Sequence, residues 1–229
     1  MLLASCSRAT LPTASSTLTE LNSITAKDIP EYLENLDRRD PIAPYYRDPL
    51  TKEQTLQFFT SLTQSENVAR VILDSSEKYG VRPSLSFALA LEESDFRVDA
   101  INRNGDSVDR GLFQLNSKSY PKLAVQDFYD PSINARYGIS HLKGCLSQAG
   151  NEVAALAMYN AGNGRVERGA TPKKTLNYVS RILGYEDNIS SLFAAKVMST
   201  ARPPMPGVAR LIAESISLGL VSNAVGKKN

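Results

Sequence analysis

The sequence predicts an α+β fold that is dominated by helix. Four or five segments after residue 65 carry apolar residues at helical spacing, and Asn104-Gly105-Asp106 is a turn sequence typical of a β-hairpin. The chain has 229 residues, of which 42% are hydrophobic and 22% are charged. This length and composition favour a folded protein with one domain and extensions, or with two small domains.

The part of the chain before residue 65 is polar. Four prolines interrupt residues 20–64, and within them residues 51–62 predict a short helix with Thr51 as N-cap. No motif in this region points to chemistry. We therefore expect an N-terminal extension that either packs on the main domain or recruits a partner.

Two helices are expected next, at residues 68–79 and 84–93. Val68, Ile72 and Tyr79 follow helical spacing up to Gly80, a residue that commonly ends helices. The second helix is apolar around most of its circumference, so it should be buried on most sides.

The remaining elements have clear start and stop signals. A two- or three-stranded sheet is expected within residues 101–116, around the turn sequence. Asp130 followed by Pro131 begins a helix that should end at Gly150. Shorter helices are expected at residues 153–159, closed by Gly162, and at 175–183.

The last segment, residues 189–229, is expected to be a helical tail. Residues 208–225 have apolar side chains near helical spacing and predict an amphipathic helix that packs on the protein's own surface. No run reaches the roughly 18 apolar residues that a membrane-spanning helix needs.

Charge and residue counts exclude several classes of protein. The net charge is +2, from 26 basic and 24 acidic residues, and no long basic run argues for nucleic-acid binding. One histidine and two cysteines cannot form a zinc site of the usual kind or a disulfide-rich scaffold.

The two cysteines differ in context. Leu3-Ala4-Ser5-Cys6 resembles the bacterial lipobox, in which the cysteine is lipidated, and residues 7–19 read as a Ser/Thr-rich tether. The residues before Cys6 lack the charged and apolar parts of an export signal, so we expect a truncated signal. The alternative is a chance match. Cys145 lies in a helical pattern and is expected to pack as a small buried residue, with no disulfide implied.

Glu93 is the residue whose position points most directly to chemistry. It ends a helix that should be buried, and both burial and the negative end of the helix dipole raise a carboxyl pKa. A carboxylic acid that stays protonated near neutral pH can act as the general acid in glycoside cleavage. Periodicity does not choose between Glu92 and Glu93, and a solvated helix end is the alternative.

Four motifs follow one another along the chain: Glu93-Ser94, Gly111-Leu112-Phe113-Gln114, Tyr159-Asn160-Ala161-Gly162 and Tyr178-Val179. Together they resemble the lytic transglycosylase catalytic domain of the lysozyme-like superfamily. The resemblance covers about residues 65–187 and implies a lysozyme-like fold with a small hairpin or sheet beside an active-site groove.

The resemblance implies roles for individual residues. Glu93 is expected to be the general acid/base, and the expected substrate-binding residues are Gln114, Tyr159, Asn160 and Tyr178. Tyr159 should lie near Glu93 and orient it or the sugar. For Asn160 the alternative is a helix cap, and for Tyr178 a core tyrosine with a satisfied hydroxyl.

Two further residues are expected to be structural. Ser94 should help to close its helix, and His141 should be a surface or half-buried residue. The resemblance implies peptidoglycan glycan strands as the partner, with no metal or organic cofactor.

The sequence departs from the family pattern at three places. Phe113 replaces the usual methionine, and Leu115-Asn116-Ser117 resembles the lysozyme and secretion-associated branch. Asp109 lies where animal-type lysozymes carry a second carboxylate, which retaining hydrolysis requires about 5 Å from the first. Asp109 has structural alternatives, as a partner of Arg103 or Arg110 or as a turn cap.

The expected function is a lytic transglycosylase that cleaves the β-1,4 bond between N-acetylmuramic acid and N-acetylglucosamine and forms 1,6-anhydromuramic acid. The alternatives are a lysozyme-type hydrolase that uses Glu93 and Asp109, and a non-catalytic wall-binding module.

The expected organisation is a signal and tether at 1–19, extensions at 20–64 and 189–229, and the catalytic domain at 65–188. Lipidated Cys6 would anchor the protein to a membrane in the bacterial periplasm.

Overall fold

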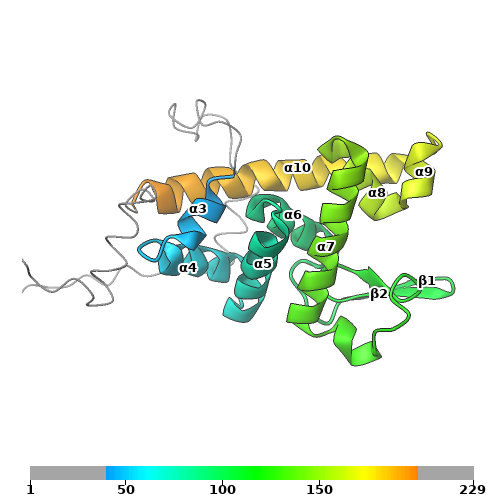
Figure 1. Cartoon of the computed structure of the whole chain (residues 1–229), viewed down its shortest axis with the longest axis horizontal. Helices are drawn as coiled ribbons and strands as arrows, with labels where there is room; N and C mark the ends of the chain where they lie inside the picture. Colours follow the sequence, from blue (N-terminus) through cyan, green and yellow to red (C-terminus); the bar gives the residue numbers. More distant parts are fainter. Residues whose placement is uncertain (1–39, 201–229) are drawn as a thin grey trace, which may run out of the picture.

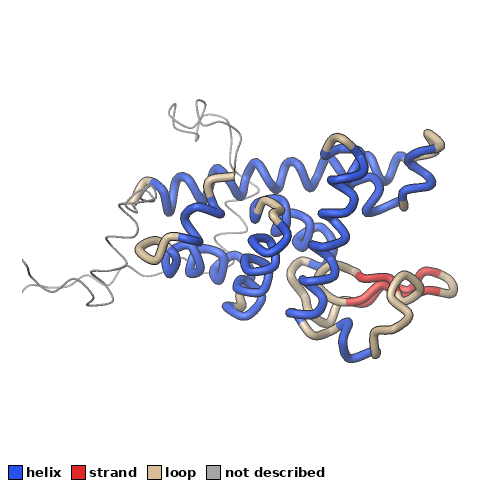
Figure 2. The backbone as a smooth tube through the Cα atoms, viewed as in Figure 1, coloured by secondary structure: helices blue, strands red, loops and turns tan. Residues whose placement is uncertain are grey.

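The computed structural model describes residues 40–200, and most of them are helical (Figure 2). The chain forms α3 (Ile42–Arg47), α4 (Lys52–Thr63), α5 (Glu66–Tyr79), α6 (Pro83–Ser94), β1 (Ile101–Asn104), β2 (Ser107–Arg110), β3 (Leu115–Asn116), α7 (Pro131–Ala149), α8 (Glu152–Ala161), α9 (Asn163–Glu167) and α10 (Lys173–Phe193). The predicted α+β, mainly helical fold is confirmed. Cys6 and the helix predicted at 208–225 lie outside the described residues.

Local sequence explains where three of the helices begin. The side chains of Ser65, Asp130 and Asn151 accept hydrogen bonds from backbone N–H groups in the first turns of α5, α7 and α8, at 3.3, 2.8 and 2.8 Å. Thr51 directly precedes α4, as expected, but its hydroxyl donates to the carbonyl of Tyr45 at 2.7 Å instead of capping the helix.

Three described helices differ from the sequence expectation, because α9, like α3, was not expected. The helix predicted to end at Leu183 continues as α10 to Phe193. Burial of Ile189, Leu192 and Phe193 outweighs the cost of about 1 kcal/mol for Gly184 inside a helix. The short α3 was not predicted, because Pro44 interrupts its sequence. A proline in the first turn of a helix removes no hydrogen bond.

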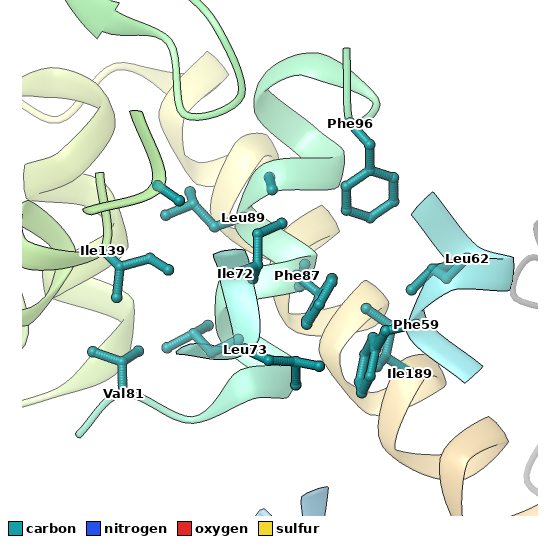
Figure 3. Packing of buried hydrophobic residues seen from close by; sticks show 14 of the residues in the cluster. Phe59, Leu62, Ile72, Leu73, Val81, Phe87, Leu89, Phe96, Ile139 and Ile189 are labelled. Carbon is teal, nitrogen blue, oxygen red and sulfur yellow. The ribbon is translucent and has the colours of Figure 1, made fainter. Parts of the chain in front are cut away.

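A large hydrophobic core runs through the described residues (Figure 3), and a small second cluster lies around Cys145. Phe59 of α4 stacks on Phe87 of α6 with ring centroids 4.0 Å apart, and Phe193 of α10 meets Phe58 at 5.4 Å. Residues 42–63 therefore pack on the helices that carry the motifs. The boundaries predicted at 64/65 and 188/189 fall within this continuous core.

The three strands form an antiparallel sheet in the order β1-β2-β3. Asn104 pairs with Ser107, so the turn consists of Gly105 and Asp106, and Gly105 has a φ of +57° that glycine adopts without strain. The sheet lies at the opposite end of the long axis from α3 and α4, while α10 extends along most of that axis (Figure 1). Within residues 40–200 no helix is long and apolar enough to cross a membrane.

Candidate active site

Glu93 lies in the last turn of α6, where the helical part of the molecule meets the sheet. Asp95 and Phe96 follow it with φ angles of +54° and +59°, so the helix stops there and the chain turns toward β1. The neighbouring Ser94 is buried, whereas Glu93 keeps part of its side chain exposed. The carboxyl group therefore sits at the edge of the core with access from outside.

The structure distinguishes Glu93 from Glu92. Arg181 of α10 holds the Glu92 carboxylate through both of its oxygens, at 2.5 to 3.1 Å. Among the described residues, no basic side chain forms an ion pair with Glu93. Removal from water, and to a lesser degree the charges of Glu92 and Asp109, raise the pKa of Glu93 to about 8. At neutral pH Glu93 is therefore mostly a neutral carboxylic acid.

Tyr178 of α10 is in direct contact with Glu93. Its hydroxyl donates a hydrogen bond to Oε1 of Glu93 at 2.5 Å. This bond lowers the pKa of Glu93 and partly opposes the effect of burial. Because the hydroxyl occupies Oε1, the acidic proton of Glu93 is directed to Oε2. Tyr178 is buried, and its hydroxyl is satisfied by the glutamic acid itself.

Tyr159 of α8 makes its hydrogen bond to the backbone. Its hydroxyl donates to the backbone carbonyl of Phe113 at 2.9 Å rather than to Glu93. Burial and then the charge of Glu93 raise the pKa of Tyr159, which indicates that the two side chains are close. Tyr159 thus lies beside the acid and holds the segment that follows β2, while Tyr178 makes the contact with Glu93.

Two side chains fasten the sheet to the helices around Glu93. The Ser94 hydroxyl donates to the carbonyls of Ala90 and Leu112, at 3.1 and 2.8 Å, so it closes its helix and also binds the segment after β2. Asn134 of α7 is fully buried, accepts from the N–H of Phe113 at 2.8 Å, and donates to the carbonyls of Arg110 and Phe128 at 2.9 and 2.7 Å.

The close packing of α7 and the Phe128 region against the segment after β2 requires glycine at two positions. A Cβ atom at Gly111 would lie 2.2 Å from the carbonyl oxygen of Phe128, and the φ of Gly111 is +76°. A Cβ atom at Gly138 would lie 2.3 Å from Cβ of Phe113. The close approach of α7 to the segment after β2 explains both glycines.

Gln114 and Asn160 take part in backbone and helix contacts. The amide nitrogen of Gln114 donates to the carbonyls of Gly111 and Ala100, at 3.0 and 3.3 Å, and the residue has a φ of +46°. Asn160 is exposed and accepts from the hydroxyl of Thr175 at 2.8 Å, which joins the end of α8 to the start of α10. Their predicted roles in substrate binding stay predictions.

Asp109 lies on β2 and is held by two neutral amides. Asn116 donates to its Oδ1 at 2.7 Å, and Asn104 donates to its Oδ2. These partners replace Arg103 and Arg110, which the sequence offered as alternatives. The charge of Asp109 contributes to the raised pKa of Glu93, so the sheet brings the two carboxyl groups within electrostatic reach.

His141 and Cys145 lie one turn apart on α7. The His141 ring packs against the ring of Tyr159, with centroids 4.9 Å apart. Cys145 is free and buried and packs with Ala155 and Met158. These are the structural positions that the sequence predicted.

The contacts through which Arg181 and Thr175 support the site were not predicted from the sequence. Arg181 neutralises Glu92, and Thr175 binds Asn160. Each lies far along the chain from its partner, and no local pattern signals such a pair.

In the described residues a helical body meets a small three-stranded sheet, and a glutamic acid with a raised pKa lies where the two join. Residues 70–179 match the family described as the transglycosylase SLT domain. The matched segment is slightly less than half of the chain, and this part of the chain is similar to the transglycosylase SLT domain.

Several individual proteins are similar to parts of this chain. A peptidoglycan-binding-like protein of Escherichia coli O157:H7 is 29% identical over 148 residues, which are 56% of this chain and 86% of the relative. Invasion protein IagB of Salmonella typhimurium is 32% identical over 97 residues, 39% of this chain and 61% of the relative. The lytic transglycosylase Slt of Pseudomonas aeruginosa, solved as an inactive mutant, aligns over 85% of this chain and 39% of its own, with 21% identity and a TM-score of 0.46.

Proposed function

We propose that this protein cleaves the β-1,4 bond between N-acetylmuramic acid and N-acetylglucosamine in peptidoglycan, with Glu93 as general acid and then general base. The observation that carries the proposal is the state of Glu93. It is protonated near neutral pH because of burial, while the adjacent Glu92 is neutralised by Arg181.

The proposed reaction needs one carboxyl group and a hydroxyl of the substrate. Glu93 donates its proton from Oε2 to the oxygen of the breaking glycosidic bond, so the leaving sugar departs as an alcohol. The carboxylate then accepts the proton of the C6 hydroxyl of muramic acid as that oxygen bonds to C1. The product is a 1,6-anhydro ring, no water is consumed, and Glu93 ends protonated as it began.

The hydrogen bond from Tyr178 supports both steps. It fixes the carboxyl orientation and leaves Oε2 for the substrate. It also stabilises the carboxylate that forms after the first proton transfer. In this proposal Gln114, Tyr159 and Asn160 line the groove that receives the strand.

Glu93→Gln tests the assignment. We expect a loss of activity on purified sacculi of about 100-fold or more, since the amide cannot donate and recover a proton. Circular dichroism should report an unchanged fold. Glu92→Gln is the matched control on the neighbouring residue and should keep most of the activity. Comparable activity in Glu93→Gln and the wild type would overturn the proposal.

A lysozyme-type hydrolase is the second candidate, because Asp109 lies within electrostatic reach of Glu93. The engagement of both Asp109 oxygens by Asn104 and Asn116 favours a role in holding the hairpin. Mass spectrometry of the released fragments separates the two reactions, because anhydro products are lighter by one water. Asp109→Asn should leave anhydro products dominant. Hydrated products from the wild type that disappear in this variant would establish the hydrolase.

We also propose that the protein works in the bacterial periplasm, anchored through a lipid on Cys6. The lipobox resemblance and the wall substrate support this location. In cells fed a labelled fatty acid, the wild type should carry the label and Cys6→Ser should lose it. Equal labelling of the two would rule out Cys6 as the modified residue.

A further inference from the structure

A basic corner lies beside the proposed active site, where α9 ends and α10 begins. It consists of Arg165, Arg168, Lys173 and Lys174, which are all exposed. Within residues 163–174 the only acidic side chain is Glu167, and its carboxylate accepts a hydrogen bond from Asn163 at 2.9 Å. None of the four basic side chains forms an ion pair with a residue in the described range 40–200.

The two lysines occupy an electrostatically unfavourable place. They are the first two residues of α10, where the N-terminal end of the helix already carries partial positive charge, and the first turn has no acidic residue. No side chain caps this end. Like charges gathered at such a position cost stability in the isolated protein, and an anionic ligand relieves that cost.

The basic corner is close to the proposed active site. Lys174 precedes Tyr178 by one helical turn, about 6 Å of rise, and Tyr178 bonds to Glu93. The Thr175–Asn160 bond ties the same turn to the end of α8. In Figure 1, α8, α9 and the sheet lie at the same end of the long axis. A glycan strand bound at Glu93 would therefore pass near the corner.

The proposed substrate carries the matching charge. In peptidoglycan, short peptides branch from the lactyl group of muramic acid, and these stems carry free carboxylates. A stem of three or four residues reaches about 10 Å or more from the sugar at roughly 3.5 Å per residue. Since Lys174 lies one helical turn from Tyr178, which bonds to Glu93, a stem on the reacting muramic acid would be long enough to approach the corner.

We infer that the basic corner of Arg165, Arg168, Lys173 and Lys174 binds the carboxylates of the peptide stems, so that this domain prefers stem-bearing strands to bare glycan. The inference rests on the proposed function, because it needs the strand to lie at Glu93. It assigns to the corner a role in choosing the substrate and not in the bond cleavage.

The experiment compares two forms of one substrate. Sacculi are digested intact, or after an amidase has removed the stems, with the wild type, Lys173→Gln/Lys174→Gln and Arg165→Gln/Arg168→Gln. On intact sacculi each double variant should raise KM about fivefold to tenfold with little change in kcat, as expected for the loss of two surface ionic contacts. On bare strands the variants and the wild type should have similar KM values. The preference of the wild type for intact sacculi over bare strands should become smaller as the salt concentration rises.

Lys143→Gln is the matched control, because Lys143 is an exposed lysine on α7 outside the basic corner. It should keep the preference of the wild type. Equal KM of the wild type on both substrates would overturn the inference, yet leave the proposed function intact if Glu93→Gln is inactive. If the lysine variants lose binding to acidic lipid vesicles and keep the stem preference, the corner is a membrane contact and the inference is wrong.

Discussion

The protonation state of Glu93 results from several opposing contributions in its surroundings. Burial and the negative charges of Glu92 and Asp109 raise its pKa, while the hydrogen bond from Tyr178 lowers it, with a net value of about 8. A group of this kind is protonated in the folded protein at pH 7 and ionised in the unfolded chain. The same side chain therefore provides the proposed acid and reduces stability at neutral pH.

That linkage gives a prediction about stability. Because the folded pKa of Glu93 is above the unfolded value of 4.5, stability is lost as pH rises from about 4.5 to about 8 and changes little beyond. Glu93→Gln removes this loss and should stabilise the protein by on the order of 2 kcal/mol at pH 8, with little effect at pH 4. Urea unfolding at the two pH values measures the difference. A destabilised variant at pH 8 would show that the carboxyl group is a structural partner.

Tyr178 and Tyr159 form a matched pair for testing contact with the acid. Tyr178→Phe removes a bond that stabilises the carboxylate, so the pKa of Glu93 should rise further. The alkaline limb of the pH profile of kcat/KM, expected near pH 8 in the wild type, should move up by about one pH unit. The rate at pH 7 should fall about tenfold, because the carboxyl group loses its orientation.

Tyr159→Phe is the control for that shift. The hydroxyl of Tyr159 binds the Phe113 carbonyl, so its loss should weaken the fold by about 1 kcal/mol and leave the alkaline limb in place. The assignment of the two tyrosines would be contradicted if Tyr159→Phe moved the limb and Tyr178→Phe did not.

At the scale of elements, sequence signals predicted the positions of the helices better than they predicted the contacts between helices. Ser65, Asp130 and Asn151 mark the starts of α5, α7 and α8, because a cap depends on residues only three positions apart. The choice between Glu92 and Glu93 depended instead on Arg181, which lies 89 positions along the chain from Glu92. Such a partner is set by the packing of α10 on α6.

The contribution of Asn134 can be measured directly. Its amide bonds to Phe113, Arg110 and Phe128 between α7 and the segments around the sheet. Asn134→Ala leaves three backbone groups without their partner and should cost about 3–5 kcal/mol in the free energy of unfolding. Asn102→Ala on the exposed strand β1 should cost less than about 0.5 kcal/mol. A loss below 1 kcal/mol in Asn134→Ala would mean that α7 and the sheet are held together by other contacts.

The basic corner could not be predicted from the order of residues along the chain. Its four cations are interrupted by Glu167, Gly169 and Pro172, so the sequence contains no long basic run. The turn between α9 and α10 brings them to one edge of the molecule. The overall charge of +2 likewise gives no sign of it. Local charge and net charge are separate properties of a surface.

At the scale of the whole molecule, α10 connects the core to the proposed active site. Tyr178 near its start bonds to Glu93, whereas Phe193 at its end packs against Tyr45 and Phe58. The four motifs lie between residues 93 and 179, yet the aromatic core that supports α6 and α10 draws on residues 45–59 and 193. The segment that carries the motifs is therefore shorter than the unit that we expect to fold.

This difference predicts the behaviour of two fragments. Residues 65–188 contain every predicted site residue of the catalytic domain but lack Phe58, Phe59 and Phe193. Each of these buried rings contributes roughly 1.5–3 kcal/mol to the free energy of unfolding, and their absence exposes Phe87. Since a domain of this size is stable by only about 5–15 kcal/mol, we expect this fragment to be unfolded or to bind a hydrophobic dye. Residues 40–200 should unfold cooperatively on heating and retain activity on sacculi. A cooperative, active 65–188 fragment would instead show that α3, α4 and the end of α10 are dispensable additions to the catalytic fold.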